Sequence, residues 1–251
     1  MKQKKIYNKI KIQSAANEKQ IAILLDPDKI DYDSLPNLIQ DCILNKISYF
    51  FVGGSLITSN QLSSLILFIK NHCDIPVILF PGNSLHIDNQ ADGLLFLSLI
   101  SGRNAEFLIG QQVISAPILK QSGLEIMSTG YILIDSGQQT TVSYISNTTP
   151  IPHNKTEIAV CTAMAGEMLG MSLIYLDGGS GAKNAISPEM IAGVKAAIEV
   201  PLIIGGGINS IEKAKNAFNA GADIIVIGNK IEQDPNFINE LGKLLKPLIT
   251  K

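Results

Sequence analysis

The chain has 251 residues, the length typical of one closed α/β barrel, although two smaller domains would also account for it. It is 46% hydrophobic and only 17% charged, which favours a fold whose strands are buried on both faces. The formal net charge is −2 and no long basic run occurs, so a nucleic-acid partner is not expected.

The beginning of the chain does not have the pattern of a secretory signal, because the basic segment Met1–Lys11 precedes a polar stretch rather than an apolar one. No apolar run reaches the ~18 residues of a membrane-spanning helix. We therefore expect a cytoplasmic protein. Cys42, Cys73 and Cys161 lie far apart without a CxxC spacing, so we expect each to pack as a small apolar residue, without disulfides or a zinc site.

Short apolar runs alternate with helical patterns along the chain, which is typical of repeated βα units around a parallel sheet. The pattern predicts one (β/α)8 TIM-barrel domain over residues 1–251, with no linker or domain boundary. The eight predicted strands are Ile21–Leu25, Tyr49–Val52, Val77–Phe80, Gly93–Leu97, Gly130–Ile134, Leu173–Leu176, Leu202–Ile204 and Ile224–Ile227.

Apolar residues at helical spacing predict amphipathic helices over 62–69 and 211–218, and Ser187-Pro188 has the form of a helix start. Two regions depart from this rhythm. Residues Ser84–Gln90 are too few and too polar for a full barrel helix, so the third helix is predicted to be abbreviated into a loop. Residues Gln138–Asn154 form an insertion after the fifth strand, predicted to be an extended ribbon before a helix near Thr156. The insertion is either a lid or wall of the active site or a surface excursion.

Three of the later strands end in glycine-rich segments. Gly205-Gly206-Gly207 follows the seventh strand, Gly228-Asn229 follows the eighth, and Gly178 to Gly181 follows the sixth. Glycine lets backbone N–H groups approach a phosphate without a side chain in between, and barrel enzymes often bind phosphate after strands 7 and 8. The spacing therefore predicts a pocket for a phosphorylated small molecule.

Carboxylates and hydroxyls are expected at the same rim. Asp177 ends the sixth strand and is a candidate general base toward an alcohol. Asp26 follows the first strand and Ser55 the second, a pair suited to Mg²⁺, which takes one or two protein oxygens and completes its shell with water and phosphate oxygens.

Five ordered motifs span nearly the whole chain: LLDPDK at 24–29, FVGGS at 51–55, YLDGGSGA at 175–182, GGGI at 205–208 and VIGN at 226–229. Together they resemble the geranylgeranylglyceryl phosphate synthase family, which includes bacterial heptaprenylglyceryl phosphate synthases. The resemblance implies an Mg²⁺-dependent prenyltransferase that joins sn-glycerol 1-phosphate to a polyprenyl diphosphate, with geranylgeranyl diphosphate the expected donor, and releases diphosphate.

By the same resemblance, Asp26 and Ser55 would hold Mg²⁺ against the diphosphate, and Asp177 would be the catalytic base. The implied contacts of sn-glycerol 1-phosphate are Tyr175, Leu176, Asp177, Gly178, Gly179, Ser180, Gly181, Gly206, Gly207, Gly228 and Asn229. Two positions depart from the family pattern. Many members have Glu at the position of Asp177, and some have a phosphate-binding Lys at the position of Leu24, where another donor must act here.

The prenyl chain requires an apolar tunnel, for which the central strands offer Phe80, Phe96, Leu97, Tyr131 and Ile134; the same residues also suit an ordinary barrel core. Arg103 is either a diphosphate contact or a surface residue. The three histidines, His72, His86 and His153, are expected to be solvated.

Two alternatives stay open. One is another phosphate-binding barrel enzyme, such as a sugar-phosphate isomerase; an aldolase is disfavoured because no lysine ends a strand. The other is a non-catalytic binder of prenyl or phosphate ligands, which turnover would exclude. Self-association and transient peripheral contact with membrane are also expected.

Overall fold

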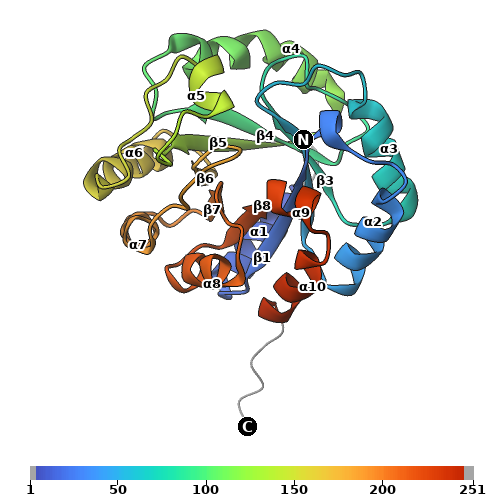
Figure 1. Ribbon diagram of the computed structural model, residues 1–251. Coiled ribbons are helices and arrows are strands. Elements are labelled where there is room, and N and C mark those ends of the chain that lie inside the picture. Colours follow the sequence, from blue (N-terminus) through green and yellow to red (C-terminus); the bar gives the residue numbers. More distant parts are fainter. Residues whose placement is uncertain (1–3, 246–251) are drawn as a thin grey trace.

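The computed structural model describes residues 4–245, which form a closed barrel of eight parallel strands in the order β1 to β8. The strands are β1 Gln20–Leu25, β2 Tyr49–Gly54, β3 Val77–Pro81, β4 Gly93–Leu99, β5 Glu125–Leu133, β6 Leu173–Asp177, β7 Leu202–Gly205 and β8 Ile224–Ile227. Pairing of β1 with β8 closes the sheet. The (β/α)8 barrel predicted from the sequence is thus confirmed (Figure 1).

The described residues contain ten α-helices, most of which surround the strands in a ring (Figure 1). They are α1 Lys5–Ala15, α2 Leu35–Leu44, α3 Leu62–His72, α4 Gln111–Ser122, α5 Thr141–Ile145, α6 Thr156–Met168, α7 Pro188–Ala197, α8 Ile211–Asn219, α9 Asn229–Gln233 and α10 Phe237–Leu241. A π-helical turn, η2, covers Glu106–Gly110 before α4, and 3-10 turns cover Pro27–Lys29 (η1) and Gly242–Leu244 (η3).

The predicted helices over 62–69, 211–218 and from Thr156 are confirmed as α3, α8 and α6. Ser187 caps α7, because its hydroxyl accepts a hydrogen bond from the Met190 N–H at 3.2 Å. The segment between β3 and β4 contains no helix, as predicted for Ser84–Gln90.

Three expectations were wrong. The insertion is not an extended ribbon but contains the short helix α5, and only Ile151 pairs with a strand end, at Ile134. Strand β5 begins at Glu125, five residues before the predicted start, because it pairs along the full length of the long strand β4. Cys42 is buried, but Cys161 is exposed on α6.

The core has two layers, which follow from alternation of side chains along each strand. In β2, Tyr49 and Phe51 fill the barrel interior, while Phe50 packs outward against the helices. In β6, Tyr175 faces the interior and Leu176 faces outward. This two-sided burial accounts for the continuous apolar runs that identified the strands.

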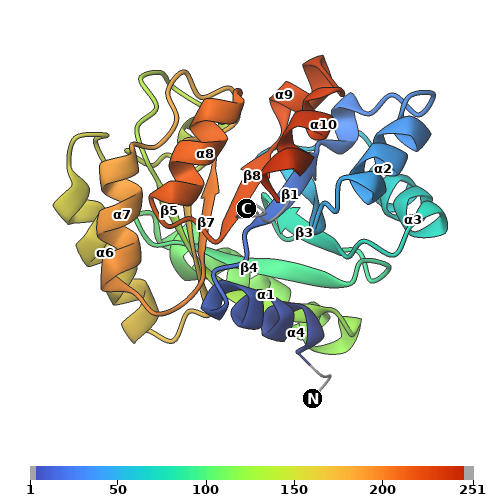
Figure 2. The same ribbon diagram turned by 90° about the horizontal axis from the view of Figure 1, so that it is seen from below.

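Helix α1 lies across the amino-terminal end of the barrel, on the side opposite α9 (Figure 2). Its residues Ile6 and Ile10 are buried with the barrel interior. The Glu125 carboxylate, at the start of β5, accepts hydrogen bonds from the N–H groups of Ile6 at 2.9 Å and Tyr7 at 2.7 Å. These are N–H groups of the first helical turn, which have no partner within the helix.

Replacing Glu125 with Ala is therefore expected to lower the free energy of unfolding by about 2 kcal/mol, since two N–H donors lose a charged acceptor at a buried position. Urea denaturation followed by circular dichroism measures the change. Replacing the exposed Glu199 with Ala is the control and should change stability by less than about 0.5 kcal/mol. Equal stability of the two variants would mean that α1 is held by packing alone.

Candidate active site

A polar cavity of about 500 Å³ opens at the carboxyl ends of the strands. Residues that follow β1, β2, β6, β7 and β8 meet there, as expected for a barrel of parallel strands. The predicted site residues among its lining are Asp26, Ser55, Tyr175, Asp177, Gly179, Ser180, Gly181, Gly206, Gly207, Gly228 and Asn229.

Two predicted residues, Leu176 and Gly178, do not line the cavity. Leu176 is fully buried in the outer layer, since its neighbours Tyr175 and Asp177 face inward and side chains alternate along β6. Gly178 extends the ladder, and its N–H donates to the Gly205 carbonyl at 3.0 Å. Both residues thus shape the strand end without facing the cavity.

The glycine pair after β7 forms a tight turn. Gly206 and Gly207 both have φ in the left-handed region, at 81° and 70°. A side chain on Gly206 would come within 2.7 Å of the Gly178 nitrogen, so only glycine fits between the β6 and β7 loops. Among the described residues, no protein acceptor takes a hydrogen bond from either N–H group. Consecutive N–H groups of this kind form an anion-binding concavity.

Asp177 is the buried carboxylate of the cavity, 7% exposed at the end of β6. Its Oδ1 accepts a hydrogen bond from the Gly179 N–H at 2.8 Å, and its Oδ2 accepts a short one from the Tyr131 hydroxyl. Burial raises the pKa of Asp177 above its usual value, and these two hydrogen bonds oppose the rise only in part. A carboxylate with a raised pKa inside a pocket is suited to proton transfer.

Asp26 and Ser55 lie at the ends of the adjacent strands β1 and β2, and both line the polar cavity. Asp26 Oδ1 accepts from the Asp28 N–H, and Asp26 Oδ2 forms an ion pair with Lys29 Nζ at 3.2 Å. Lys29 Nζ also lies 3.6 Å from Glu232 Oε2. Leu24 also lines the cavity but carries no charge. Lys29 lines the same cavity, and its ammonium group supplies the positive charge that Leu24 does not.

The donors present fit Mg²⁺. One carboxylate and one hydroxyl are hard oxygen ligands, and Mg²⁺ commonly takes the rest of its octahedral shell from water and substrate phosphate. Within residues 4–245, no cluster of three or more His, Cys, Asp or Glu side chains is suited to hold a metal. A cation at Asp26 and Ser55 would therefore depend on substrate oxygens.

Asp28 organises the loop after β2, a role that the sequence did not reveal. Its carboxylate accepts hydrogen bonds from the N–H groups of Thr58 at 2.7 Å and Ser59 at 2.9 Å, and from the Thr58 hydroxyl. The hydrogen bonds from Ser59 and Thr58 hold the pKa of Asp28 well below its usual value. This contact joins the loop after β1 to the loop that begins with Ser55.

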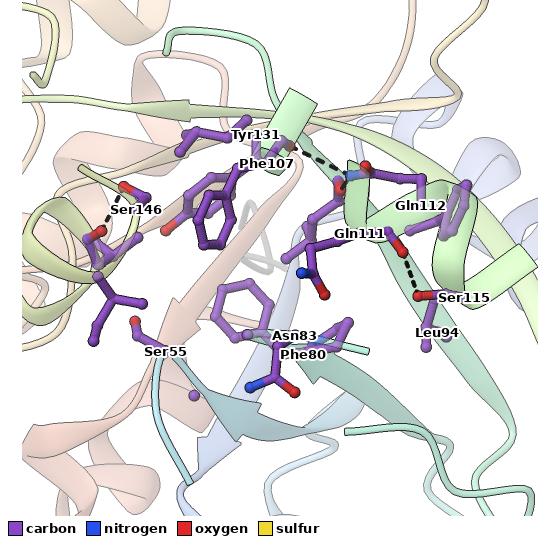
Figure 3. Close-up of a pocket in the computed structure, with 18 of the residues that line it drawn as sticks. Ser55, Phe80, Asn83, Leu94, Phe107, Gln111, Gln112, Ser115, Tyr131 and Ser146 are labelled. Atoms are coloured by element: carbon purple, nitrogen blue, oxygen red, sulfur yellow. Dashed lines mark hydrogen bonds between the residues drawn. The ribbon is translucent and has the colours of Figure 1, made fainter. Parts of the chain in front are cut away.

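A second, apolar cavity adjoins the first. It is lined by aromatic and aliphatic side chains of β3, β4, β5, η2 and α4, among them Phe80, Leu94, Phe96, Leu97, Leu99, Phe107, Leu119 and Tyr131. Figure 3 shows Phe80, Phe107 and Tyr131 around the same space, with the Gln111 amide reaching toward it. Of the residues predicted for a prenyl tunnel, only Ile134 lies elsewhere; it is part of the outer core.

The absence of a helix between β3 and β4 explains where this cavity lies. Strands β3 and β4 pair at only two positions, Ile78 with Gly93 and Leu79 with Leu94, and diverge beyond them. The helix-free loop that follows β3 lines the cavity with Gly82 and Ile87, and α4 lines it from the other side. The cavity thus passes from the barrel interior toward the outer layer.

The two cavities share Gly54, Ser55 and Phe80 in their linings. The insertion forms a further wall common to both, since Thr141 lines the polar cavity and the next residue, Val142, lines the apolar one. The insertion also packs on the β6 loop, because a side chain on Gly179 would come within 2.8 Å of Thr140 Oγ1. The structure thus favours a substrate wall over a surface excursion.

Two other polar candidates lie outside the cavity linings. The Arg103 guanidinium donates to carbonyl groups of its own loop, including Gly102 at 2.8 Å. His86 was expected to be solvated but is 6% exposed, and its Nδ1 accepts a hydrogen bond from the Gly82 N–H. Burial lowers the pKa of His86. The hydrogen bond from Gly82 to His86 stabilises the helix-free loop after β3.

Comparison with known proteins agrees with this geometry. The sequence profile of the PcrB family matches residues 14–245. A geranylgeranylglyceryl phosphate synthase from Spirosoma linguale is 55% identical over 231 residues, which cover 92% of this chain and 93% of that protein. One from Chitinophaga pinensis is 52% identical over 238 residues, covering 95% of this chain and 94% of that protein.

Among solved structures, (S)-3-O-geranylgeranylglyceryl phosphate synthase from Thermoplasma acidophilum, in complex with its substrate sn-glycerol-1-phosphate, superposes with a TM-score of 0.88 at 30% identity. The match covers 95% of this chain and 96% of that one. Family profile, sequence identity and fold agree over nearly the whole length, and this chain belongs to the PcrB family, with relatives named geranylgeranylglyceryl phosphate synthase.

Proposed function

We propose that this protein transfers a polyprenyl group from its diphosphate to a hydroxyl of sn-glycerol 1-phosphate, forming an ether and releasing diphosphate. The observation that carries the proposal is the meeting of two unlike cavities near one buried carboxylate. A polar, glycine-lined cavity adjoins an apolar one at Gly54, Ser55 and Phe80, and Asp177 is linked to both. The relatives are named for a geranylgeranylglyceryl phosphate, the kind of product that such a transfer would form.

The polar cavity suits sn-glycerol 1-phosphate. The turns at Gly206-Gly207 and Gly228-Asn229 offer backbone N–H groups to the phosphate, and Tyr175 and Ser180 line the same space. A glycerol hydroxyl that extends from this phosphate toward β6 would approach Asp177, which would be the base of the reaction. The substrate named for the Thermoplasma acidophilum relative supports this assignment.

The apolar cavity suits the hydrocarbon chain of the donor, with the diphosphate at the junction. Asp26 and Ser55 would hold Mg²⁺ there, and the bound metal would neutralise charge that develops on the departing diphosphate. The protein's own residues protect and bind the reacting end of the donor. Phe80 and Tyr131 keep water from its first carbon, and Lys29 places a positive charge beside the diphosphate.

The direct test incubates the purified protein with sn-glycerol 1-phosphate, labelled geranylgeranyl diphosphate and Mg²⁺, with heptaprenyl diphosphate in parallel, followed by extraction into organic solvent. A metal-dependent prenylglyceryl phosphate is the expected product. Binding of both ligands without turnover would favour a non-catalytic binder. Absence of product with either donor, together with turnover of a sugar phosphate, would favour an isomerase.

Replacing Ser115 with Phe is expected to shift the donor preference toward short chains. Ser115 is a buried α4 residue of the apolar cavity wall, and a phenyl group there would take up space that a long chain needs. We expect the ratio of kcat/KM for geranylgeranyl over geranyl diphosphate to fall by about tenfold or more, the usual scale for a few lost apolar contacts. An unchanged ratio in a folded variant would mean that the prenyl chain of the donor binds outside the apolar cavity.

Self-association, peripheral membrane contact and a cytoplasmic location stay predictions from the sequence. Within residues 4–245, no helix has both the length and the apolarity needed to cross a membrane.

A further inference from the structure

Both carboxylate oxygens of Asp177 are already engaged by the protein. The Gly179 N–H donates to Oδ1 at 2.8 Å, and the Tyr131 hydroxyl donates to Oδ2. The Gly179 contact ties the carboxylate to the loop immediately after β6, and the aspartate side chain is short. Each oxygen of Asp177 therefore already accepts a hydrogen bond from the protein. A substrate hydroxyl would have to share an oxygen with the Gly179 N–H or the Tyr131 hydroxyl.

Tyr131 connects Asp177 with the apolar cavity. It lies directly opposite Tyr175 in the pairing of β5 with β6, and its ring packs edge-on against Tyr175 with centroids 5.4 Å apart. The ring centroid is 6.1 Å from that of Phe80, which lines both cavities. Tyr131 lines the apolar cavity, yet its hydroxyl reaches a residue of the polar one. Its phenolic oxygen thus lies beside the space where the two proposed substrates must meet.

We propose that Tyr131 is a further catalytic residue, whose hydroxyl passes the proton of the attacking glycerol hydroxyl to Asp177. The inference rests on the proposed prenyl transfer. In that step the glycerol oxygen bonds to the first carbon of the prenyl group, and the bond from this carbon to the diphosphate oxygen breaks with its electron pair. The glycerol proton moves to the Tyr131 oxygen as the tyrosine proton moves to Asp177 Oδ2, so only Asp177 gains a proton overall.

The surroundings of Tyr131 keep the phenol in the form that the relay needs. Burial and the neighbouring Asp177 carboxylate raise the pKa of Tyr131 well above its usual value, so the hydroxyl keeps its proton near neutral pH. It donates that proton in the hydrogen bond to Asp177 and has lone pairs left to accept another. A phenol held in this way lengthens the reach of a short carboxylate.

The test compares Tyr131→Phe with the unaltered protein in the product assay. Loss of the hydroxyl should lower kcat by about 100-fold or more, within the range for a lost acid–base group, and should leave the KM for sn-glycerol 1-phosphate within about threefold. Tyr49→Phe is the matched control, since the buried Tyr49 hydroxyl donates to Gln20 at 2.8 Å and lines neither cavity. Thermal unfolding and binding of sn-glycerol 1-phosphate establish that both variants are folded.

A second variant separates a relay from a positioning role. Combining Tyr131→Phe with Asp177→Glu lengthens the carboxylate side chain by one methylene, so that it can reach the hydroxyl directly; we expect at least tenfold recovery over Tyr131→Phe alone. A Tyr131→Phe variant with kcat within threefold of the unaltered protein would overturn the relay, and so would a double variant without recovery. Failure of the proposed function is recognised separately, because the unaltered protein would then form no product.

Discussion

Replacing Asp177 with Asn is expected to lower kcat for prenyl transfer by at least about 100-fold while the protein still folds and binds sn-glycerol 1-phosphate. The amide has nearly the same shape, and its oxygen can still accept a hydrogen bond from Tyr131 or Gly179. It cannot take a proton from a hydroxyl at neutral pH. Steady-state kinetics with each substrate varied in turn measure the loss.

Replacing Asp135 with Asn is the matched control. Asp135 follows the neighbouring strand β5, its carboxylate accepts from the Gly137 N–H at 2.9 Å, and it lines neither cavity. We expect this variant to keep kcat within about threefold of the unaltered protein. Equal kcat losses in the two variants would contradict a role for Asp177 as the base.

The pH dependence of the same reaction gives an independent check. Burial raises the pKa of Asp177, and the hydrogen bonds from Tyr131 and Gly179 lower it by less. The base acts only when deprotonated, so kcat/KM should fall as the pH drops through this raised pKa. The acidic limb should therefore lie above the value of about 3.9 for an ordinary aspartate. A limb at or below that value would contradict the assignment.

Replacing Asp26 with Asn should also lower activity by about 100-fold or more and raise the Mg²⁺ concentration needed for half-maximal rate. Asp26 is the carboxylate proposed to hold the metal, and an amide is neutral and a weaker ligand. Removal of metal from the unaltered protein with a chelator should abolish product formation, and added Mg²⁺ should restore it.

The matched control for Asp26 is Asp31→Asn, which removes a carboxylate from the same loop outside both cavity linings. It should leave the Mg²⁺ dependence unchanged. If Asp26→Asn had the Mg²⁺ dependence of the unaltered protein, the metal would bind elsewhere, and the ion pair of Asp26 with Lys29 would be a structural contact.

Features that depend on local sequence were predicted well. The strands were found because both of their faces are buried, which leaves a continuous apolar run, and the helices because one face is apolar at regular spacing. The segment at Gly206-Gly207 was singled out because glycine has no side chain to keep a phosphate from the backbone N–H groups, a property of the residue itself; its left-handed backbone was found in the structure. Strand β5 was started too late, because its first residues are not a continuous apolar run and only pairing with β4 orders them.

Features that depend on contacts between distant segments needed the tertiary structure. Nothing near Tyr131 in the sequence indicates that its hydroxyl meets Asp177, 46 residues later. Likewise, Asp28 meets Thr58 and Ser59 only because β1 and β2 are neighbours in the barrel. The short helix α5 also escaped prediction, since its β-branched residues favour strands; in the structure the Ser143 hydroxyl accepts a hydrogen bond from the Thr140 N–H at 3.1 Å and caps the first turn.

The sequence by itself determined the barrel, the glycine turns and the order of polar residues at the strand ends, because each follows from a residue's own conformational preference or from burial along one element. Only the tertiary structure decided that the helix-free segment between β3 and β4 leaves an apolar cavity beside the polar one, and that Asp177 is buried with two hydrogen-bond donors. These properties arise from side chains that come together when the sheet closes, and no local pattern records which partners they meet.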